Sequence, residues 1–338
     1  MEYSIHNLIG EVTFGEMQNF SNLTVFPTFY NVDNKVSYLS LNIALDNGYV
    51  KIGEVSESGT VNNLYVENLS EHYILLLDGE ELIGAKQNRV LNSTILLDKK
   101  SKTEIPVSCV ESGRWSYQSK HFSSSDRIMS SKSKSRKMQD VNLNFERNEG
   151  YLKFQADQRR VWNSVDELLN TRKAFSSSSA MSDAFESSRD KMEDYLKSFK
   201  YLENQSGFVI AINNKIIGFE YISDPQIFSI YFKKLLRGYV IDALDNQKKN
   251  AAIITTEQAR NFIMSVKDAK QFNDKSIGLG NSFRFTGENC IAASLIEKDE
   301  VIHYSQLYKD TADIEPEEQY GGQSTIRRRH GDGFSSRD

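Results

Sequence analysis

Two runs of charged and amide side chains lie directly against strongly apolar segments of this chain. The first runs from Leu77 to Arg89 and the second from Pro106 to Trp115, and we call them the first and second polar blocks. A simple pattern of apolar core and polar surface would not concentrate such residues there, because polar groups among apolar segments need partners. The two blocks therefore mark the candidate functional site.

The end of the first block offers two cations and two amides in a row. Lys86 and Arg89 suit the oxygens of a phosphate or carboxylate, and Gln87 and Asn88 suit hydrogen bonds that fix a ligand's orientation. Gly84 in front of them would let a backbone or a ligand approach closely. The alternative is an exposed polar loop.

The start of the first block supplies two candidate catalytic carboxylates. Asp78-Gly79 suits a tight hairpin turn between strands at 73–77 and 80–83. Glu80 and Glu81 follow the turn, and consecutive strand residues face opposite ways, so one of them would point into a sheet face or cleft. A carboxylate there could be a general base, a metal ligand or an ion-pair partner.

The second block adds Glu111 as a third candidate carboxylate, Arg114 as an anion clamp and Trp115 as a stacking surface. The alternatives are a surface ion pair for the arginine and a core position for the tryptophan. Cys109 reads better as a small buried residue than as a nucleophile, because no histidine lies near it in sequence. Both blocks flank strands of one antiparallel unit, so we expect them to meet in space.

Sequence patterns of known metal and phosphate sites are missing. The chain has no Cys-x-x-Cys, no His-x-x-x-His, no calcium-binding loop, no phosphate-binding glycine fingerprint and no Gly-x-Ser-x-Gly, and no two of its five histidines are close in sequence. We predict no metal site and assign no cofactor.

Composition narrows the class of protein. A chain of 338 residues favours two lobes, and a net charge of −5 with a pI near 5.7 makes nucleic acid an unlikely partner. No apolar run approaches the ~18–20 residues that cross a bilayer. The N-terminus lacks a secretory pattern, and Cys109 and Cys290 lie far apart. We expect a soluble cytoplasmic protein with reduced thiols and no membrane partner.

The pattern of elements predicts an α+β fold. Residues 1–118 read as a β-rich antiparallel lobe, a sandwich or open barrel, with one helix at 37–45. Residues 119–143 are rich in serine and lysine and have no apolar period, which predicts a mobile linker. The strands expected in the first lobe lie at 12–14, 23–30, 50–55, 63–66, 73–77, 90–97 and 103–110.

Residues 144–310 read as a mixed lobe with helices packed on a small antiparallel sheet. Asn213-Asn214 marks a hairpin tip, Asp224-Pro225 a helix start and Thr255 to Gln258 a capping box. Strands are expected near 283–285, 291–296 and 301–307. Residues 311–338 have no apolar period and read as a disordered tail, which, like the linker, could recruit a protein partner.

The two polar blocks resemble the signature segments of the ARG and rhodanese-phosphatase-superfamily-associated protein domain family, across roughly residues 5–308. The similarity continues through Val161-Trp162, Leu235 to Tyr239 and Val301 to His303. The family has no assigned biochemical activity. Its name implies a setting of ADP-ribose or nucleotide metabolism, in the manner of bacterial conflict systems, but association is not mechanism.

The sequence thus supports a protein that binds, and in one version processes, a small anionic ligand such as an ADP-ribose-like nucleotide. The alternative is a non-catalytic interaction protein whose polar blocks form a structural network. Whether the protein is an enzyme is left open at this point. An open basic pocket would favour the first hypothesis, and closed, mutually satisfied hydrogen bonds would favour the second.

Overall fold

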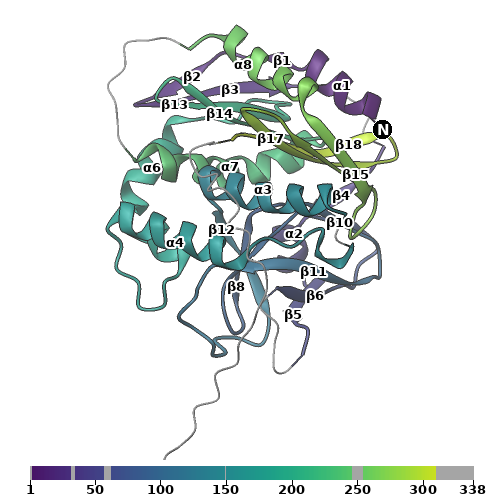
Figure 1. Ribbon diagram of the computed structural model, residues 1–338, viewed down its shortest axis with the longest axis vertical. Helices are drawn as coiled ribbons and strands as arrows, with labels where there is room; N and C mark the ends of the chain where they lie inside the picture. The colour runs from purple at the N-terminus through teal and green to yellow at the C-terminus, as the bar shows by residue number, and fades with distance from the viewer. Residues whose placement is uncertain (1, 32–34, 57–61, 149, 246–253, 310–338) are drawn as a thin grey trace, which may run out of the picture.

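The computed structural model describes residues 2–31, 35–56, 62–148, 150–245 and 254–309. A large antiparallel sheet forms the upper layer in Figure 1, and a smaller β-rich half lies below it, with helices between and beside them. The fold is therefore α+β, as the sequence predicts. None of the described helices is long and apolar enough to cross a membrane.

The upper layer is a nine-stranded sheet that takes strands from both ends of the chain. Its order is β1-β3-β13-β14-β18-β17-β16-β15, with β2 also paired to β3. Its strands are β1 (Thr13–Phe14), β2 (Gln18–Phe20), β3 (Leu23–Phe29), β13 (Gly207–Ile212), β14 (Lys215–Ile222), β15 (Lys270–Lys275), β16 (Asn281–Thr286), β17 (Cys290–Glu297) and β18 (Glu300–Tyr308).

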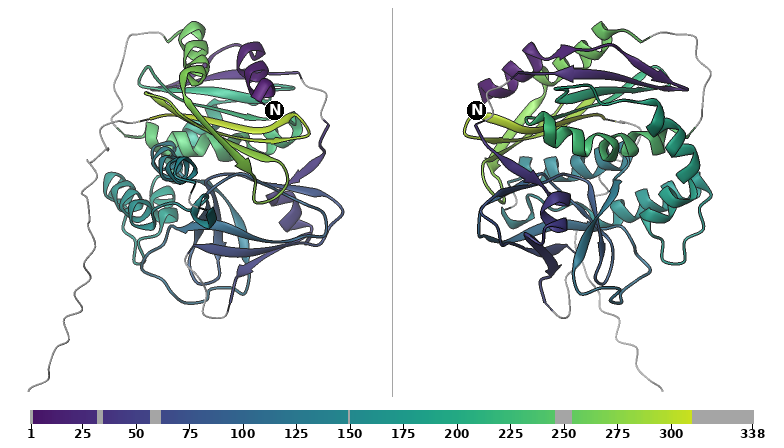
Figure 2. Two further views of the ribbon diagram at one scale, coloured as in Figure 1. Left: turned by 45° about the vertical axis from the view of Figure 1, so that its right-hand side comes forward. Right: turned by 180° about the vertical axis from the view of Figure 1, so that it is seen from behind.

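Helices cover both faces of this sheet (Figure 2). On the outer face, α1 (Glu2–Glu11) and α8 (Thr256–Met264) join an apolar cluster that includes Leu8, Ile263 and Phe219. On the inner face lie α3 (Ser131–Glu146) and α7 (Pro225–Ala243), with α4 (Gln158–Arg172), α5 (Met181–Ser187) and α6 (Arg189–Ser198) beside them. There are also two short 3₁₀ turns, η1 (Gly150–Leu152) and η2 (Ser265–Asp268).

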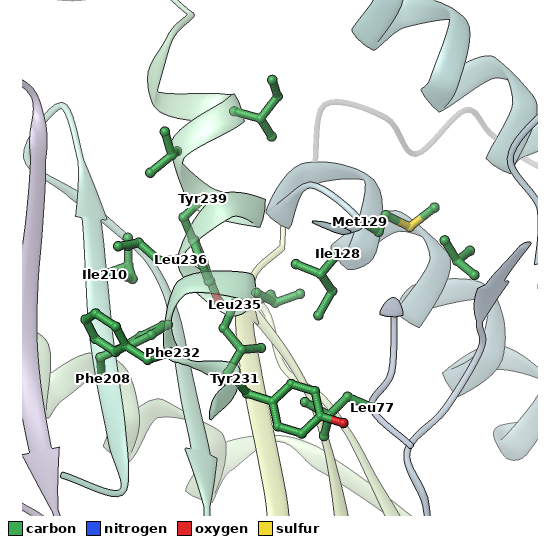
Figure 3. Close-up of a cluster of buried hydrophobic side chains, with 14 of the residues drawn as sticks. Leu77, Ile128, Met129, Phe208, Ile210, Tyr231, Phe232, Leu235, Leu236 and Tyr239 are labelled. Atoms are coloured by element: carbon green, nitrogen blue, oxygen red, sulfur yellow. The ribbon is translucent and has the colours of Figure 1, made fainter. Parts of the chain in front are cut away.

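Helix α7 forms the centre of the apolar core between the two layers (Figure 3). Phe232 and Leu236 meet Phe208 and Ile210 of the large sheet. The opposite side of the helix, through Tyr231 and Leu235, approaches Leu77, Ile128 and Met129 of the smaller half. Burying both sides of one helix ties the two halves together by the hydrophobic effect.

The smaller half is an open barrel. A six-stranded sheet runs in the order β12-β8-β9-β11-β6-β5, and its edge strands β5 and β12 contact each other without forming a ladder in the described residues. We call the line along which these two edges meet without pairing the seam. The strands are β5 (Val50–Glu54), β6 (Asn63–Asn68), β8 (Glu80–Gly84), β9 (Arg89–Leu91), β11 (Lys102–Cys109) and β12 (Phe122–Ile128).

Alternate residues of these strands fill the barrel interior. Val50 and Ile52 of β5, Leu82 of β8, Leu91 of β9 and Val107 of β11 belong to one buried cluster. A three-stranded sheet lies beside the barrel, made of β4 (Tyr38–Ser40), β7 (Tyr73–Leu76) and β10 (Ile95–Leu97), with helix α2 (Leu41–Asp46) following β4.

Several local signals are confirmed. Asn213 and Asn214 take positive φ at the tip of the β13–β14 hairpin, Asp224 accepts from the first free amides of α7, and Thr255 and Gln258 form the capping box of α8. The helix expected at 37–45 is shorter, because β4 occupies 38–40 before α2 starts. The strand expected at 90–97 is two strands, β9 and β10, in different sheets. Helix α1 was not predicted.

The predicted mobile linker at 119–143 is wrong. Most of it forms β12 and the first part of α3, and the serines of α3 and two of its lysines, Lys134 and Lys137, are buried. Lys134 donates to Glu220 at 2.8 Å in the large sheet, and Lys137 donates to Asp78 in the smaller half. These partners are distant in sequence, so no local apolar period marks the helix. The segment is thus an ordered part of the fold, and its recruitment of a protein partner stays a prediction.

The hairpin predicted at Asp78-Gly79 is also wrong. Strand β7 pairs with β10 and β4, whereas β8 pairs with β9 and β12, so the turn carries the chain from one sheet to another. Strands β1–β3 join the large sheet, so the sheets do not divide at residue 118. The lobes proposed for 1–118 and 144–310 stay a prediction, and the tail at 311–338 lies outside the described residues.

The close approach of α7 to the end of β12 can be tested at Gly238. A Cβ at this position would lie 2.8 Å from the Met129 carbonyl oxygen and 2.9 Å from Ile128 Cγ2. We expect Gly238→Ala to lower the free energy of unfolding by about 1–3 kcal/mol because the site is overpacked. In Gly10→Ala of α1 the added methyl meets nothing within 4 Å, and this control should gain up to about 1 kcal/mol. Equal urea midpoints for both variants would contradict the tight packing.

Candidate functional site

The two polar blocks meet at one end of the barrel. Arg114 lies in the loop after β11, and its Nη2 donates to Glu111 Oε2 at 2.6 Å and to Asn88 Oδ1 at 3.1 Å. Its Nη1 donates to the Ala85 carbonyl oxygen at 2.8 Å. The second block thus holds the loop of the first through a guanidinium group that is only 9% exposed.

Glu111 is held from several sides. Its Oε2 also accepts from the backbone N–H of Asn88 at 3.0 Å, and its Oε1 accepts from the Ser178 hydroxyl at 2.8 Å. Burial opposes ionisation of this carboxyl, but the hydrogen bonds from Arg114, Asn88 and Ser178 outweigh it, and the pKa of Glu111 is lowered. A buried ionised carboxylate with its partners in place is suited to holding loops together. The lowered pKa makes Glu111 a poor proton acceptor.

Behind this pair lies a second set of polar groups that points into the barrel. Gln87 Nε2 donates to the Glu111 carbonyl oxygen at 2.9 Å, and Gln87 Oε1 accepts from Arg89 Nη1 at 2.9 Å. The Cys109 thiol donates to the same Oε1 at 3.1 Å. Burial raises the pKa of Cys109 despite the nearby Arg89, so the thiol stays protonated and is a weak nucleophile.

Arg89 is fully buried and only partly satisfied. In the described part of the chain its Nε and Nη2 have no hydrogen-bond partner, and Nη2 lies 4.0 Å from Glu54 Oε1. Glu54 follows Val50 and Ile52 on the inward face of β5, and its Oε2 likewise has no partner among the described residues. Burial lowers the pKa of Arg89, with Cys109 and Glu54 opposing that shift. A buried guanidinium group with spare donors is costly, which makes this pair the least satisfied part of the network.

The outer side of Glu54 faces an open cleft of about 600 Å³. We call it the first cleft; it lies at the seam and is lined by Gly53, Glu54, Ser56 and residues 117–121. Tyr117 is 53% exposed, and Trp115 next to it is 48% exposed. The Lys86 ammonium group lies 5.2 Å from the Trp115 ring centroid and 5.1 Å from that of Tyr117, so it is held by both aromatic faces.

The carboxylates of the first block lie elsewhere, and both are buried, whereas one was expected to face solvent. Glu80 Oε1 accepts from Lys234 Nζ of α7 at 2.5 Å. Glu81 Oε2 accepts from Arg127 Nε at 2.7 Å, and burial still raises the pKa of Glu81. The nine predicted site residues therefore divide into three places: Lys86–Arg89 with Glu111, Arg114 and Trp115 at one barrel end, Glu80 beneath α7, and Glu81 beside β12.

Several residues that lie in these three places were not predicted from the sequence. Glu54 could have been found, because it continues the inward alternation of Val50 and Ile52. Lys234 gave a weaker signal, as a cation next to the buried face of α7. Within the described residues, no group of three or more His, Cys, Asp or Glu side chains is placed to hold a metal ion.

The sequence profile of the ARG and Rhodanese-Phosphatase-superfamily-associated Protein domain matches residues 11–307. The chain belongs to this family. The match includes both polar blocks and runs to the penultimate residue of β18, so it spans the elements that join the two halves. No curated protein and no protein of solved structure matches the chain significantly.

The buried Glu111–Arg114 pair generates a prediction about stability. Arg114→Ala would leave Glu111 buried without its cation, so we expect the free energy of unfolding to fall by about 3–5 kcal/mol. Arg189 makes an exposed i,i+3 pair with Glu186, and Arg189→Ala should leave the thermal midpoint nearly unchanged. If both variants melted with the wild type, Arg114 would be available for ligand binding and not part of the scaffold.

Proposed function

We propose that this protein binds a small anionic ligand with a planar ring, a nucleotide or an ADP-ribose-like molecule, in the first cleft. The observation that carries the proposal is the buried Arg89, with two guanidinium nitrogens lacking hydrogen-bond partners in the described residues, directly behind the cleft wall at Glu54. The cleft volume of about 600 Å³ lies in the range of small-molecule sites.

The charges around the cleft favour an anion. Lys120 and His121 line it, Arg89 lies 4.0 Å from Glu54 in its wall, and Lys86 lies over the ring of Tyr117; Glu54 is the single carboxylate among the described lining residues. An anionic group would approach Arg89 from the side of Glu54, so the Glu54 side chain turns outward when the ligand binds. The phosphate or carboxylate oxygens then satisfy the spare donors of the guanidinium group.

The aromatic side chains favour a ligand with a flat ring. Tyr117 lines the cleft, and Trp115 shares the Lys86 ammonium group with it; both rings are about half exposed, so a nucleobase could stack on them. The family name, with its association to ADP-ribose metabolism, agrees with a nucleotide of this kind. In this proposal Arg114, Asn88 and Glu111 do not touch the ligand. They hold the loop that carries Lys86.

The second candidate is a non-catalytic interaction protein whose polar blocks are structural. The network of Glu111, Arg114, Asn88 and Ser178 favours it, because each of these residues already has hydrogen-bond partners and only Arg114 Nε lacks one among the described residues. The first candidate requires a ligand to bind in the first cleft, and the second does not.

Titration with ADP-ribose and with AMP, followed by calorimetry, tests the proposal. We expect saturable binding, and Tyr117→Ala should weaken it about tenfold or more because a stacking surface is lost. Phe175 is 91% exposed and does not line the cleft, so Phe175→Ala is the matched control and should bind as the wild type does. An absence of binding at millimolar concentrations of both nucleotides would reject this ligand class and favour the structural alternative.

A further inference from the structure

A second cleft, of about 350 Å³, lies farther along the seam. It is lined by α2, β5 and the first half of β12, including Asn42, Lys51, Ser123 and Ser124. His121 lines both clefts, so the two are neighbours. The second cleft differs from the first because an acid–base pair, Glu80 and Lys234, is buried beneath its wall.

Ser124 presents a hydroxyl group next to a buried acid–base pair. Its Oγ lies 2.8 Å from Lys234 Nζ and 3.0 Å from Glu80 Oε1, and Lys234 Nζ lies 2.5 Å from the same Oε1. Glu80 is fully buried and Lys234 is 4% exposed, whereas Ser124 is only partly buried and lines the cleft. The hydroxyl group is thus the member of the cluster that a molecule in the cleft would meet.

The cluster is held by regular elements. Glu80 starts β8, Ser124 lies in β12 beside it, and Lys234 reaches them from the middle of α7. Asn42 of α2 accepts from both Ser124 Oγ at 2.7 Å and Lys234 Nζ at 3.0 Å through its Oδ1. Strands and helices place side chains more accurately than loops do, as a reacting group requires.

We propose that Ser124 is the nucleophile of an ester-hydrolysing site, with Glu80 and Lys234 as its acid–base pair and a small polar carboxylic ester as substrate. A serine within hydrogen-bond reach of a lysine and a carboxylate has the geometry that activates a hydroxyl nucleophile. The small volume and the polar lining of the cleft select a short acyl group.

The reaction balances without a further reagent. Ser124 Oγ forms a bond to the acyl carbon and passes its proton to Glu80 Oε1, the ester C–O bond breaks, and Lys234 gives a proton to the departing alkoxide. Glu80 then returns a proton to Lys234 across 2.5 Å. A water oxygen then bonds to the acyl carbon and passes a proton to Glu80, and the bond to Ser124 Oγ breaks. Lys234 protonates Ser124 Oγ, Glu80 again returns a proton to Lys234, and the acid leaves. The net change is ester plus water to acid plus alcohol.

Labelling with a fluorophosphonate tests the nucleophile directly. We expect the wild-type protein to gain one phosphonyl group on Ser124 with loss of fluoride, located by peptide mapping, and to hydrolyse p-nitrophenyl acetate. Ser124→Ala should abolish the label and lower turnover about 100-fold or more. Ser198 is an exposed serine of α6 that lines neither cleft, and Ser198→Ala is the matched control that should keep both.

Labelling that survives in Ser124→Ala, or is absent from the folded wild type, would overturn the proposal. Glu80→Gln keeps the shape of the side chain but removes the proton acceptor, so labelling should slow by about 100-fold. An unchanged labelling rate in that variant would remove Glu80 from the mechanism. The inference does not depend on the nucleotide ligand of the first cleft, and either can fail while the other stands.

Discussion

The buried lysines of α3 are the interaction on which the arrangement of the two halves depends. Lys134 is bonded to Glu220 and Ser305 of the large sheet, and Lys137, one turn later, is bonded to Asp78 and the Leu91 carbonyl oxygen of the smaller half. A buried ammonium group without its carboxylate costs several kcal/mol. The two sheets therefore cannot slide past α3 without exposing an unpaired charge, and Lys234 on α7 repeats the arrangement with Glu80.

Because these lysines find their partners far along the chain, some elements could be predicted from the sequence and others could not. Elements whose signals are local were predictable: the paired asparagines at 213–214, the Asp224-Pro225 start and the Thr255 capping box all act within a few residues. Helix α3 was not, because its buried serines and lysines find partners far along the chain. Lys134 is 86 residues from Glu220, and Lys137 is 59 from Asp78. A pattern of apolar residues cannot report such a helix.

The candidate sites show the same division. That the two polar blocks meet follows from the strands they flank, and the Glu111–Arg114 pair is three residues apart. Ser178, in the loop after α4, donates the hydrogen bond that Glu111 Oε1 accepts, and this contact could not be predicted from the two blocks. The burial of both Glu80 and Glu81 depends on Lys234 and Arg127, from other elements. Both clefts lie where β5 and β12 meet without pairing. This arrangement results from the whole barrel, so the sequence of one segment could not predict it.

The pairing of β3 with β13 has a consequence for the synthesis of the chain. Thr28 lies opposite Gly207, 179 residues later, and the open barrel is made entirely from the chain between them. At about 5–20 residues per second, β3 leaves the ribosome on the order of ten seconds or more before its partner. A strand as apolar as Leu23 to Phe29 must be kept from pairing wrongly during that wait. Chaperone demand during translation should therefore concentrate on the first thirty residues.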